Sequence, residues 1–438
     1  MKVKLLPQED QTNGWSAILA PRKPSPALAR SVKADWLVIG AGYAGLGAAR
    51  RLAELRPNDS IVVVDAGIVG ENASGRNSGF AIDLPHNVGS SLAELEKAVN
   101  YKRLLQAGTD SLEKTVREHS IDCQWSRRGK YHCAVSEDVA EQTITHHVDE
   151  LKAMGEAYEV LDKRQLAKRL GTSYFHTGIY TPGCVLMNPA ALTRGLADTL
   201  PPNVTVYENS PVLELDFGSP VRARTDRGEI TASQVIVANN GFAQQFGLLS
   251  NKMFPMVTFA SLTPPLTKEQ QTRLAAEGEW GVTPANAVTG ATMRYTQDHR
   301  ILIRQEFVYA PAFRVSHAVR ERARLRHKRV FDARFPMLPE VQMQHFWMGT
   351  VMITRNGAPG WGRVAPNAYL SVGCNGVGVV KQTIAGSLLG DLATGNDNAL
   401  ITDMLALGQP NRMPPQPFLG IGIQAFLAKE RWVGRGEY

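Results

Sequence analysis

A short apolar run near the N-terminus gives the clearest structural signal in the chain. Residues 36–39 are apolar and lead into the glycine-rich turn of residues 40–45. Apolar and small residues then recur at helical spacing up to Leu55, and Pro57 ends that pattern. The continuous β-branched run 61–64 is typical of a parallel strand buried on both faces. The pattern predicts a strand, a helix and a second strand, which together form one βαβ unit.

Later segments add further strands and helices. Short strands are predicted at residues 205–207, 212–217, 222–225, 234–238, 300–308 and 369–372, and helices at 92–118 and 139–154. A helix with one apolar stripe follows the glycine-rich turn 373–378 and ends at Gly395. The predicted class is α/β plus α+β: a discontinuous Rossmann-like domain, and a second domain on a large mixed or antiparallel sheet. The first domain is expected to comprise residues 1–90, 186–250 and 345–438, with a C-terminal helical tail, and the second residues 91–185 and 251–344.

The glycines of the first turn, which reads GAGYAG, have separate roles. One makes the tight turn, one lets a pyrophosphate approach the backbone, and one lets the helix pack closely on the strand. Phosphates favour the N-terminus of the helix, where unpaired N–H groups and the helix dipole attract negative charge. Asp65 follows Gly45 by twenty residues, at the tip of the second strand, where a carboxylate can accept hydrogen bonds from ribose hydroxyls. This spacing predicts dinucleotide binding, although such an acid fits NAD as well as FAD.

A second glycine-rich segment helps to decide whether the expected cofactor is NAD or FAD. Residues 70–79 form a small, polar loop of the kind that closes over a pyrophosphate and the edge of a flavin. Together with the turn 373–378, this loop favours FAD over NAD. The residues predicted to bind the cofactor are Gly40, Gly42, Tyr43, Ala44, Gly45, Asp65, Ala66, Ser74, Gly75, Arg76, Asn77, Ser78, Gly79, Val212, Ala238, Gly241, Gly373, Asn375, Gly376, Val377 and Gly378.

Six motifs, spread in order over nearly the whole chain, carry a family resemblance. They are VIGAGYAGLGAARRLAEL, ASGRNSG, RYTQDHRILI, FWMGTVMIT, GRVAPNAYLSVGCNGVGVV and the tail from Pro417 to Trp432. With these motifs the chain resembles the D-amino-acid-oxidase-like family of FAD-dependent oxidoreductases, and most of all its γ-glutamylputrescine oxidoreductase branch. The resemblance implies this fold, FAD, and oxidation of a C–N bond. It does not fix the substrate, because members of one fold family act on different compounds.

Three departures from that branch argue against a polyamine-derived substrate, which stays an alternative. Ser78-Gly79 stands where the branch has Gly-Gly, and the turn 373–378 lacks the tyrosine and the histidine of the branch. A glycine-rich strand end has become Arg304-Gln305-Glu306. Gly349 stands where some relatives carry a cysteine bonded to the flavin, so we expect non-covalent FAD. A yellow colour that stays with acid-precipitated protein would contradict this expectation.

The expected reaction moves hydride equivalents from a carbon that bears nitrogen to the flavin and leaves an imine, which water hydrolyses. The substrate is expected to be a small amine, an amino acid or a cyclic imino acid such as pipecolate or proline. Lys381, in the first turn of the helix after Gly376, is the candidate catalytic residue, unless it extends to solvent. No catalytic base is assigned. The candidates for the substrate pocket are Phe80, Met256, Arg304, Glu306, Tyr309, Trp347 and Cys374.

Two of these candidates carry opposite charges. Arg304 and Glu306 alternate along a predicted strand and should therefore face the same way. If they face inward, Arg304 can hold a carboxylate and Glu306 an ammonium group. If they face outward, they form an exposed ion pair that is worth little.

The composition is that of an ordinary folded protein, with 438 residues, 43% hydrophobic and 20% charged. The four cysteines are scattered without a CxxC motif, which argues against a zinc ribbon and suits a reducing compartment. The first thirty residues lack the apolar run of a secretory signal, so a cytoplasmic location is expected. His86, His146 and His147 show no metal-ligand spacing, and we expect no metal.

The run of basic residues between Arg320 and Arg329 raises the question whether the protein binds nucleic acid. On a helix they spread over several faces, which favours a solvated surface helix and no nucleic acid. A flavin-binding module of a tRNA-modifying protein remains the alternative from another class. Oxygen or a quinone is expected to accept the electrons. The apolar C-terminal helix at 418–432 leaves association with a membrane surface open, without a spanning segment.

Overall fold

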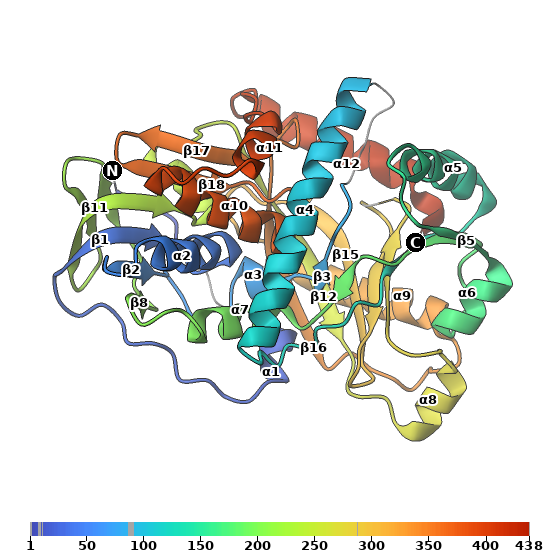
Figure 1. The fold of residues 1–438 in the computed structure, drawn as a ribbon. Coiled ribbons are helices and arrows are strands. Elements are labelled where there is room, and N and C mark those ends of the chain that lie inside the picture. The colour runs from blue at the N-terminus through green and yellow to red at the C-terminus, as the bar shows by residue number, and fades with distance from the viewer. Residues whose placement is uncertain (1, 8–9, 11, 86–91, 287, 438) are drawn as a thin grey trace.

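The predicted βαβ unit lies at the centre of a largely parallel sheet in the computed structural model, which describes residues 2–7, 10, 12–85, 92–286 and 288–437 (Figure 1). Strand β1 (Val32–Ile39) pairs in parallel with β2 (Ile61–Val64) on one side and with β11 (Glu229–Val237) on the other. All four residues of β2 are buried, as expected for a strand covered on both faces. The sheet order is β17 (Gly360–Ala365), β18 (Ala368–Val372), β11, β1, β2 and β8 (Val204–Tyr207). Strand β10 (Val221–Arg224) also pairs with β11, and β9 (Glu214–Asp216) pairs with β10.

Two helices on one face of this sheet touch almost backbone to backbone. These are α2 (Tyr43–Leu55) and α10 (Gly378–Thr394). A Cβ atom at Gly386 would lie 1.9 Å from the Ala44 carbonyl oxygen, and one at Gly47 would lie 2.6 Å from the Thr383 carbonyl oxygen. Glycine is therefore required on both helices. The contact fixes the N-terminus of each helix relative to the other.

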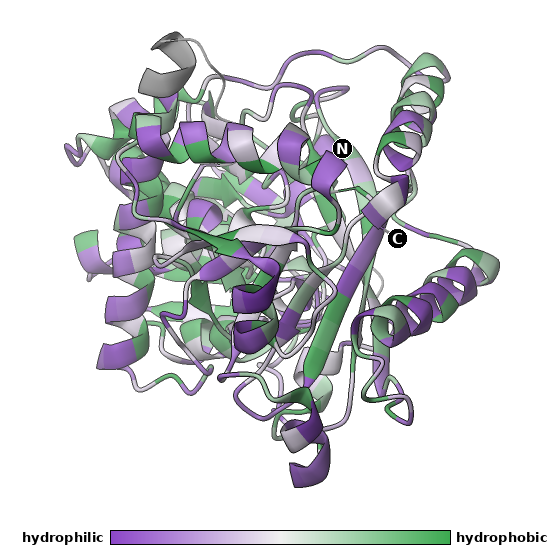
Figure 2. Cartoon of the chain, turned by 90° about the vertical axis from the view of Figure 1, so that its right-hand side faces the viewer, coloured by the Kyte–Doolittle hydropathy of each residue, from purple (hydrophilic) through white to green (hydrophobic). Residues whose placement is uncertain are grey.

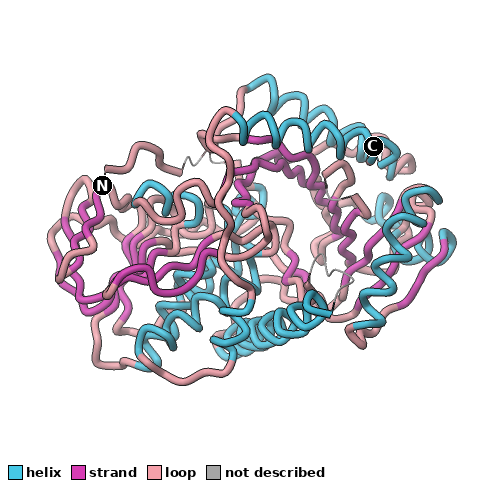
Figure 3. Tube along the Cα trace, turned by 90° about the horizontal axis from the view of Figure 1, so that it is seen from above, coloured by secondary structure: helices cyan, strands magenta, loops and turns pink. Residues whose placement is uncertain are grey.

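A second sheet lies beside the first, so that the strands form two separate groups (Figure 3). Its neighbours pair antiparallel except for β13 and β4, which are parallel. Its order is β16 (His345–Ile353), β12 (Phe254–Leu262), β15 (Ile301–Tyr309), β14 (Thr292–Tyr295), β13 (Trp280–Pro284), β4 (Lys130–Ala134), β6 (Thr177–Thr181) and β5 (Glu159–Asp162). The predicted α/β plus α+β class with a large mixed second sheet is confirmed.

Helix α4 (Leu92–Glu118), strand β16 and the C-terminal helix α12 (Phe418–Val433) lie in the other layer from the one that the predicted domain ranges gave them. Helix α4 packs on α10, because Leu104, Leu105 and Leu112 are buried in the core of the first sheet. Strand β16 pairs with β12 along its whole length and so belongs to the second sheet. The domain boundaries themselves stay a prediction.

The C-terminal helix α12 packs on the second sheet through Ile423 and Leu427, which contact Met256. Its other face exposes large apolar side chains, among them Phe418 and Trp432. None of the helices in the described part of the chain is long and apolar enough to cross a membrane.

The remaining helices surround the two sheets, and the outer helices carry hydrophilic and hydrophobic residues in turn (Figure 2). They are α1 (Gly14–Ala17), α3 (Ala73–Arg76), α5 (Glu137–Ala153), α6 (Lys163–Leu170), α7 (Pro189–Asp198), α8 (Lys268–Leu274), α9 (His317–Arg334), α11 (Leu400–Ala406), η1 (Asn240–Phe246) and η2 (Arg435–Glu437). A two-stranded sheet joins β3 (Phe80–Ala81) to β7 (Val185–Leu186).

Candidate functional site

A groove opens where β1 and β2 end. Gly40 has a φ of +107°, a conformation that favours glycine, and it turns the chain sharply into α2. The Asp65 carboxylate accepts hydrogen bonds from the backbone N–H of Ala41 at 2.7 Å and of Gly67 at 2.9 Å. Burial raises the pKa of Asp65, and these two hydrogen bonds oppose that rise. Its position at the strand tip is the one that the sequence predicts for an acid that contacts a ribose.

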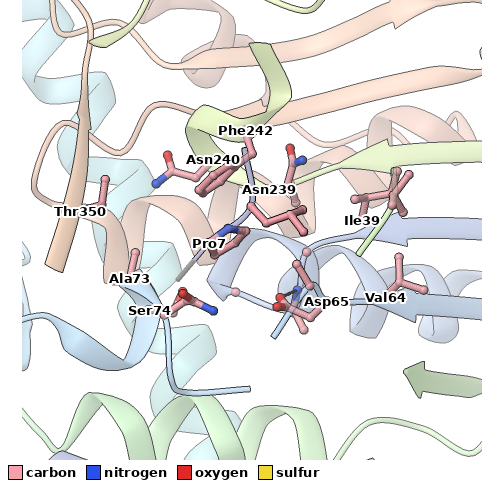
Figure 4. A pocket seen from close by; sticks show the side chains of 18 of the residues that line it. Pro7, Ile39, Val64, Asp65, Ala73, Ser74, Asn239, Asn240, Phe242 and Thr350 are labelled. Atoms are coloured by element: carbon pink, nitrogen blue, oxygen red, sulfur yellow. Dashed lines mark hydrogen bonds between the residues drawn. The ribbon is translucent and has the colours of Figure 1, made fainter. Parts of the chain in front are cut away.

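The N-terminal segment and the loop after β2 complete this groove. Leu5, Leu6 and Pro7 line it, and Figure 4 shows Pro7 between Asp65 and the asparagines at the start of η1. The Ser74 hydroxyl accepts a hydrogen bond from the Tyr43 backbone N–H at 3.3 Å, which holds the loop against the N-terminus of α2.

A larger cavity of about 760 Å³ continues from this groove. It begins at the N-termini of α2 and α10 and crosses the second sheet as far as α5. Ser74 and Asn375 both line it, although 301 positions separate them in the sequence. The Asn375 side chain accepts a hydrogen bond from the Thr354 backbone N–H at 2.8 Å, which ties the turn 373–378 to the end of β16.

Five residues form one row across the floor of the cavity. Arg304 pairs with Ala260 on one side and with Thr292 on the other. The register of β14 with β13 then brings Thr283 beside Thr292, and Thr283 pairs with His132. All five line the cavity. The cavity is thus a trough that runs across five strands.

Arg304 brings a positive charge into this trough. Its Nη1 atom is buried and has no hydrogen-bond partner among the described residues, and its guanidinium carbon lies 4.9 Å from the centroid of the Phe307 ring. Burial lowers the pKa of Arg304 to about 10, so the group stays charged at neutral pH. An unpaired cation in a cavity is suited to binding a carboxylate.

Glu306 does not face the same way, which corrects the prediction for the pair. The register of β12 and β15 shifts at this point, and Glu306 has a φ of +69°. This β-bulge adds one residue to β15, so Phe307 takes the inward position. Glu306 turns to the opposite face, where it forms an ion pair with Arg326 of α9 at 3.5 Å.

Among the other predicted pocket residues, Phe80 and Cys374 line the cavity. Three do not. Met256 is covered by Ile423 and Leu427 of α12, and the Tyr309 hydroxyl accepts a hydrogen bond from the Gln416 side chain just before that helix. Trp347 lies beyond the end of the cavity, where its indole N–H donates to the Arg76 carbonyl oxygen at 3.0 Å. Helix α12 therefore covers the part of the sheet around Met256 and Tyr309, which the sequence assigned to substrate. Trp15 of the N-terminal helix α1 packs against Trp347.

Lys381, the catalytic candidate, lines neither cavity and does not extend to solvent. It is 2% exposed, and its Nζ atom lies 5.6 Å from the centroid of the Tyr101 ring on α4. The next residue of α10, Gln382, faces the cavity instead, because successive helical residues point about 100° apart. Lys381 thus belongs to the packing of α10 on α4.

The predicted cofactor residues fall into two groups. The groove or the cavity is lined by Gly40, Gly42, Tyr43, Ala44, Asp65, Ala66, Ser74, Arg76, Asn77, Ser78, Val212, Ala238, Asn375, Gly376, Val377 and Gly378. Neither is lined by Gly45, Gly75, Gly79, Gly241 or Gly373. The first four of these serve close packing instead; a Cβ atom at Gly45, for example, would lie 1.8 Å from the Gly40 carbonyl oxygen.

The far end of the cavity holds polar residues that the sequence did not single out for binding. They are Lys130 and His132 on β4, and Thr143, His146, His147 and Glu150 on α5. The His147 Nδ1 atom lies 3.1 Å from Glu150, and the His132 and His147 ring centroids are 5.0 Å apart. No three of the histidine, cysteine or acidic side chains in the described residues are placed so that they could hold a metal ion, and His86 lies outside these residues.

The groove and cavity fit an FAD molecule. Gly42 has no side chain to keep a pyrophosphate away from the backbone. A Cβ atom at this position would lie 2.7 Å from the Ser74 hydroxyl oxygen, so a larger residue would fill the space between them. Arg76 Nη2 and Gln382 Nε2 are buried donors without a partner among the described residues, and both residues line these spaces. The N-termini of α2 and α10 meet at the same cavity, where their dipoles favour the phosphates and a reduced flavin.

Comparisons with known proteins agree with this fit. A family model described as FAD dependent oxidoreductase (DAO) matches residues 35–392. The chain is 27% identical to γ-glutamylputrescine oxidoreductase of Escherichia coli, over 88% of this chain and 90% of that protein. It is 25% identical to the probable oxidoreductase OrdL of Haemophilus influenzae, over 86% of each chain. Glycine oxidase from Geobacillus kaustophilus has a similar fold, with a TM-score of 0.71 at 19% identity, covering 87% of this chain and 100% of that one.

Proposed function

Because the chain belongs to the FAD dependent oxidoreductase family, we propose that it oxidises the C–N bond of a small amino acid, cyclic imino acid or amine that carries a carboxylate. When bound, FAD accepts a hydride equivalent from the carbon next to nitrogen, which leaves an imine that water hydrolyses. The observation that carries this proposal is Arg304, which lines the cavity and whose buried Nη1 atom has no hydrogen-bond partner among the described residues.

The chain's own residues would have three tasks. Asp65 and the N-terminus of α2 would bind the ribose and the phosphates. The N-terminus of α10 would stabilise negative charge on the flavin ring. Arg304 would hold the substrate carboxylate and so fix the carbon that loses hydride. We assign no catalytic base, because the proton of an ammonium substrate can pass to water.

Two of the compared proteins support the choice of substrate. One relative is named for γ-glutamylputrescine and the structural neighbour for glycine, so both names refer to compounds with a C–N bond. The polar floor of the trough and Arg304 favour a compound with a carboxylate over a plain polyamine. γ-Glutamylputrescine-type compounds stay within the panel that tests the proposal.

The test is anaerobic reduction of the bound flavin. The panel contains amino acids, N-methyl amino acids, cyclic imino acids and polyamine derivatives. We expect bleaching by compounds that carry a carboxylate. Arg304→Gln should lower kcat/KM for these compounds by about 10- to 100-fold and should spare amines without a carboxylate. Arg324→Gln, which removes an exposed guanidinium from α9, is the matched control. Bleaching by none of the panel would refute the proposal.

The nucleic-acid alternative gains no support from the basic run. Within α9, Arg320 pairs with Asp10, Arg324 with Glu321, and Lys328 with Asp332. These acids neutralise much of the charge that a tRNA would need. A gel shift with tRNA that weakens steeply with added salt would revive this alternative.

We further propose that oxygen or a quinone takes the electrons from the reduced flavin. Mixing the anaerobically reduced enzyme with each acceptor separately distinguishes the two. Faster reoxidation by oxygen would identify an oxidase, and faster reoxidation by the quinone would identify a dehydrogenase.

A further inference from the structure

Lys130 is a buried lysine at the far end of the trough. It lies on β4, is 2% exposed and lines the cavity. Among the described residues only the charges of more distant groups act on its Nζ atom, and none of them forms a hydrogen bond or an ion pair with it. Burial lowers the pKa of Lys130, and the charge of Asp83 offsets that effect in part without an ion pair. Such a group is costly to bury unless something anionic compensates it.

Arg304 presents the same situation at the other end of the trough. Its Nη1 atom is unpartnered, and burial is the cause that lowers its pKa. Two basic side chains thus line one cavity, and none of the acids among the described residues forms an ion pair with either. A buried charge without a partner destabilises the fold unless a ligand supplies the opposite charge, so such groups are often found in binding sites.

The register of the sheet sets the separation of Arg304 and Lys130. Arg304 and His132 lie in one row, with β14 and β13 between their strands. Three strand spacings therefore place the Cα atoms of Arg304 and His132 about 14 Å apart. Lys130 lies two residues from His132 on β4 and faces the same side of the sheet. A ligand that contacts both Arg304 and Lys130 must therefore be elongated.

The other polar groups at the far end include three histidines and Glu150, whose carboxylate lies 3.3 Å from His146 and 3.1 Å from His147. The His147 Nε2 atom is buried and has no partner among the described residues, while its Nδ1 atom is held by Glu150. His132 is fixed by the Thr283 hydroxyl at 3.2 Å. His146 lies at the rim, with 62% of its side chain exposed. These side chains give the far end both the polarity and the opening that a charged group needs to enter.

We propose that Lys130 is the centre of a second anion-binding subsite, and that the substrate is an amino or imino acid with a second carboxylate at the far end of an extended chain. Arg304 binds the carboxylate near the reacting carbon, and Lys130 binds the remote one. The inference rests on the proposed function for the reaction at the flavin, but the binding that it predicts needs no turnover.

The test titrates the flavin-loaded enzyme with unreactive acids. Straight-chain dicarboxylates from succinate to sebacate are compared with monocarboxylates of equal length, and the visible flavin spectrum reports binding. We expect the dicarboxylate of the best length to bind at least tenfold more tightly than its monocarboxylate. Lys130→Gln should abolish this advantage, and Lys130→Arg should retain part of it. Lys152→Gln, which removes an exposed ammonium from α5, should leave it intact.

The outcomes separate this inference from the proposed function. Equal binding of mono- and dicarboxylates at every length, or no binding at all, overturns the subsite in the native enzyme, even if the Lys130 variants fail to fold. A preference that survives Lys130→Gln overturns the role of Lys130. If the preference depends on Lys130 but no amine reduces the flavin, the subsite stands and the proposed function fails.

Discussion

His327 is a buried histidine that carries no charge at neutral pH. It lies on α9, is fully buried, and its Nδ1 atom lies 2.7 Å from the Ser261 hydroxyl of β12. Burial lowers the pKa of His327 to about 3, and the positive charges of Arg304 and Arg326 lower it further. In the unfolded chain the group titrates near its ordinary pKa of 6.5. Folding therefore excludes a proton that the unfolded chain takes up below that pH.

This difference predicts a loss of stability in mild acid. As the pH falls from 7 to 5, the unfolded chain gains the proton and the folded one does not, which costs about 2 kcal/mol of unfolding free energy. His327→Gln keeps a hydrogen-bonding group beside Ser261 and should lose this contribution. Urea unfolding of both proteins at pH 7 and pH 5 measures it. His317→Gln, an exposed position on the same helix, is the control and should follow the wild type.

Single residues also show what the sequence could predict about the site. Asp65 lies where its spacing placed it, because a short strand and one helix fix its distance from the glycine turn. Lys130 and His147 carry no such local signal. Lys130 reaches the cavity because β4 pairs in parallel with β13, about 150 positions further along the chain. Neither residue has a characteristic neighbour in sequence that could have revealed this pairing.

At the scale of elements, the bulge in β15 decides which charges enter the cavity. Strict alternation predicts that Arg304 and Glu306 share a face. The extra residue at the bulge reverses the alternation beyond Gln305, so only Arg304 points inward. Glu306 adopts a positive φ that its residue type does not indicate. A bulge results from the fit between two strands, and the pattern of one strand does not contain it.

Helices were easier to predict than the layers to which they belong. The predicted bounds of α4, residues 92–118, agree with the structure, because its apolar positions recur at helical spacing. The side of the molecule on which α4 packs depends on the matching surface of α10. That surface lies far along the chain, and the apolar stripe of α4 does not specify it.

The contact between α2 and α10 gives a prediction at this scale. Gly386→Ala would place a methyl group 1.9 Å from the Ala44 carbonyl oxygen, so the helices must separate. We expect a loss of about 1 to 3 kcal/mol of unfolding free energy. FAD should also bind more weakly, because the N-termini of both helices line the cofactor cavity. Urea unfolding and FAD fluorescence measure the two effects.

A matched glycine lies on α12. A Cβ atom at Gly422 would meet nothing within 4 Å, so Gly422→Ala adds a methyl group in open space. It should stabilise the helix by up to about 1 kcal/mol and leave FAD binding unchanged. Equal effects of the two substitutions would contradict the view that helix contact, and not helix propensity, makes Gly386 necessary.

At the scale of the whole molecule, Asp10 joins three parts of the chain that are distant in sequence. Its carboxylate accepts hydrogen bonds at 2.8 Å from Arg76, beside the FAD groove, and from Arg320 of α9, beyond the second sheet. Residues 5–7, just before it, line the groove. Burial alone would raise the pKa of Asp10, but hydrogen bonds from Thr12 and the two arginines lower it to about 2. The ionised carboxylate thus holds the N-terminal segment across the groove.

Asp10→Asn should therefore release FAD faster. The amide keeps the shape but loses two charge-assisted hydrogen bonds, and each such bond is worth about 1.5 to 3 kcal/mol, so we expect dissociation to accelerate by about tenfold or more. The rise in FAD fluorescence after dilution measures the rate. Because the folded pKa of Asp10 is depressed, the wild type should approach the variant only as the pH falls below 3.8 towards 2. Glu214→Gln breaks the exposed ion pair between Lys2 and β9, another link of the same segment, and should leave the rate unchanged. If both variants release FAD at the wild-type rate, the segment covers the groove without retaining the cofactor.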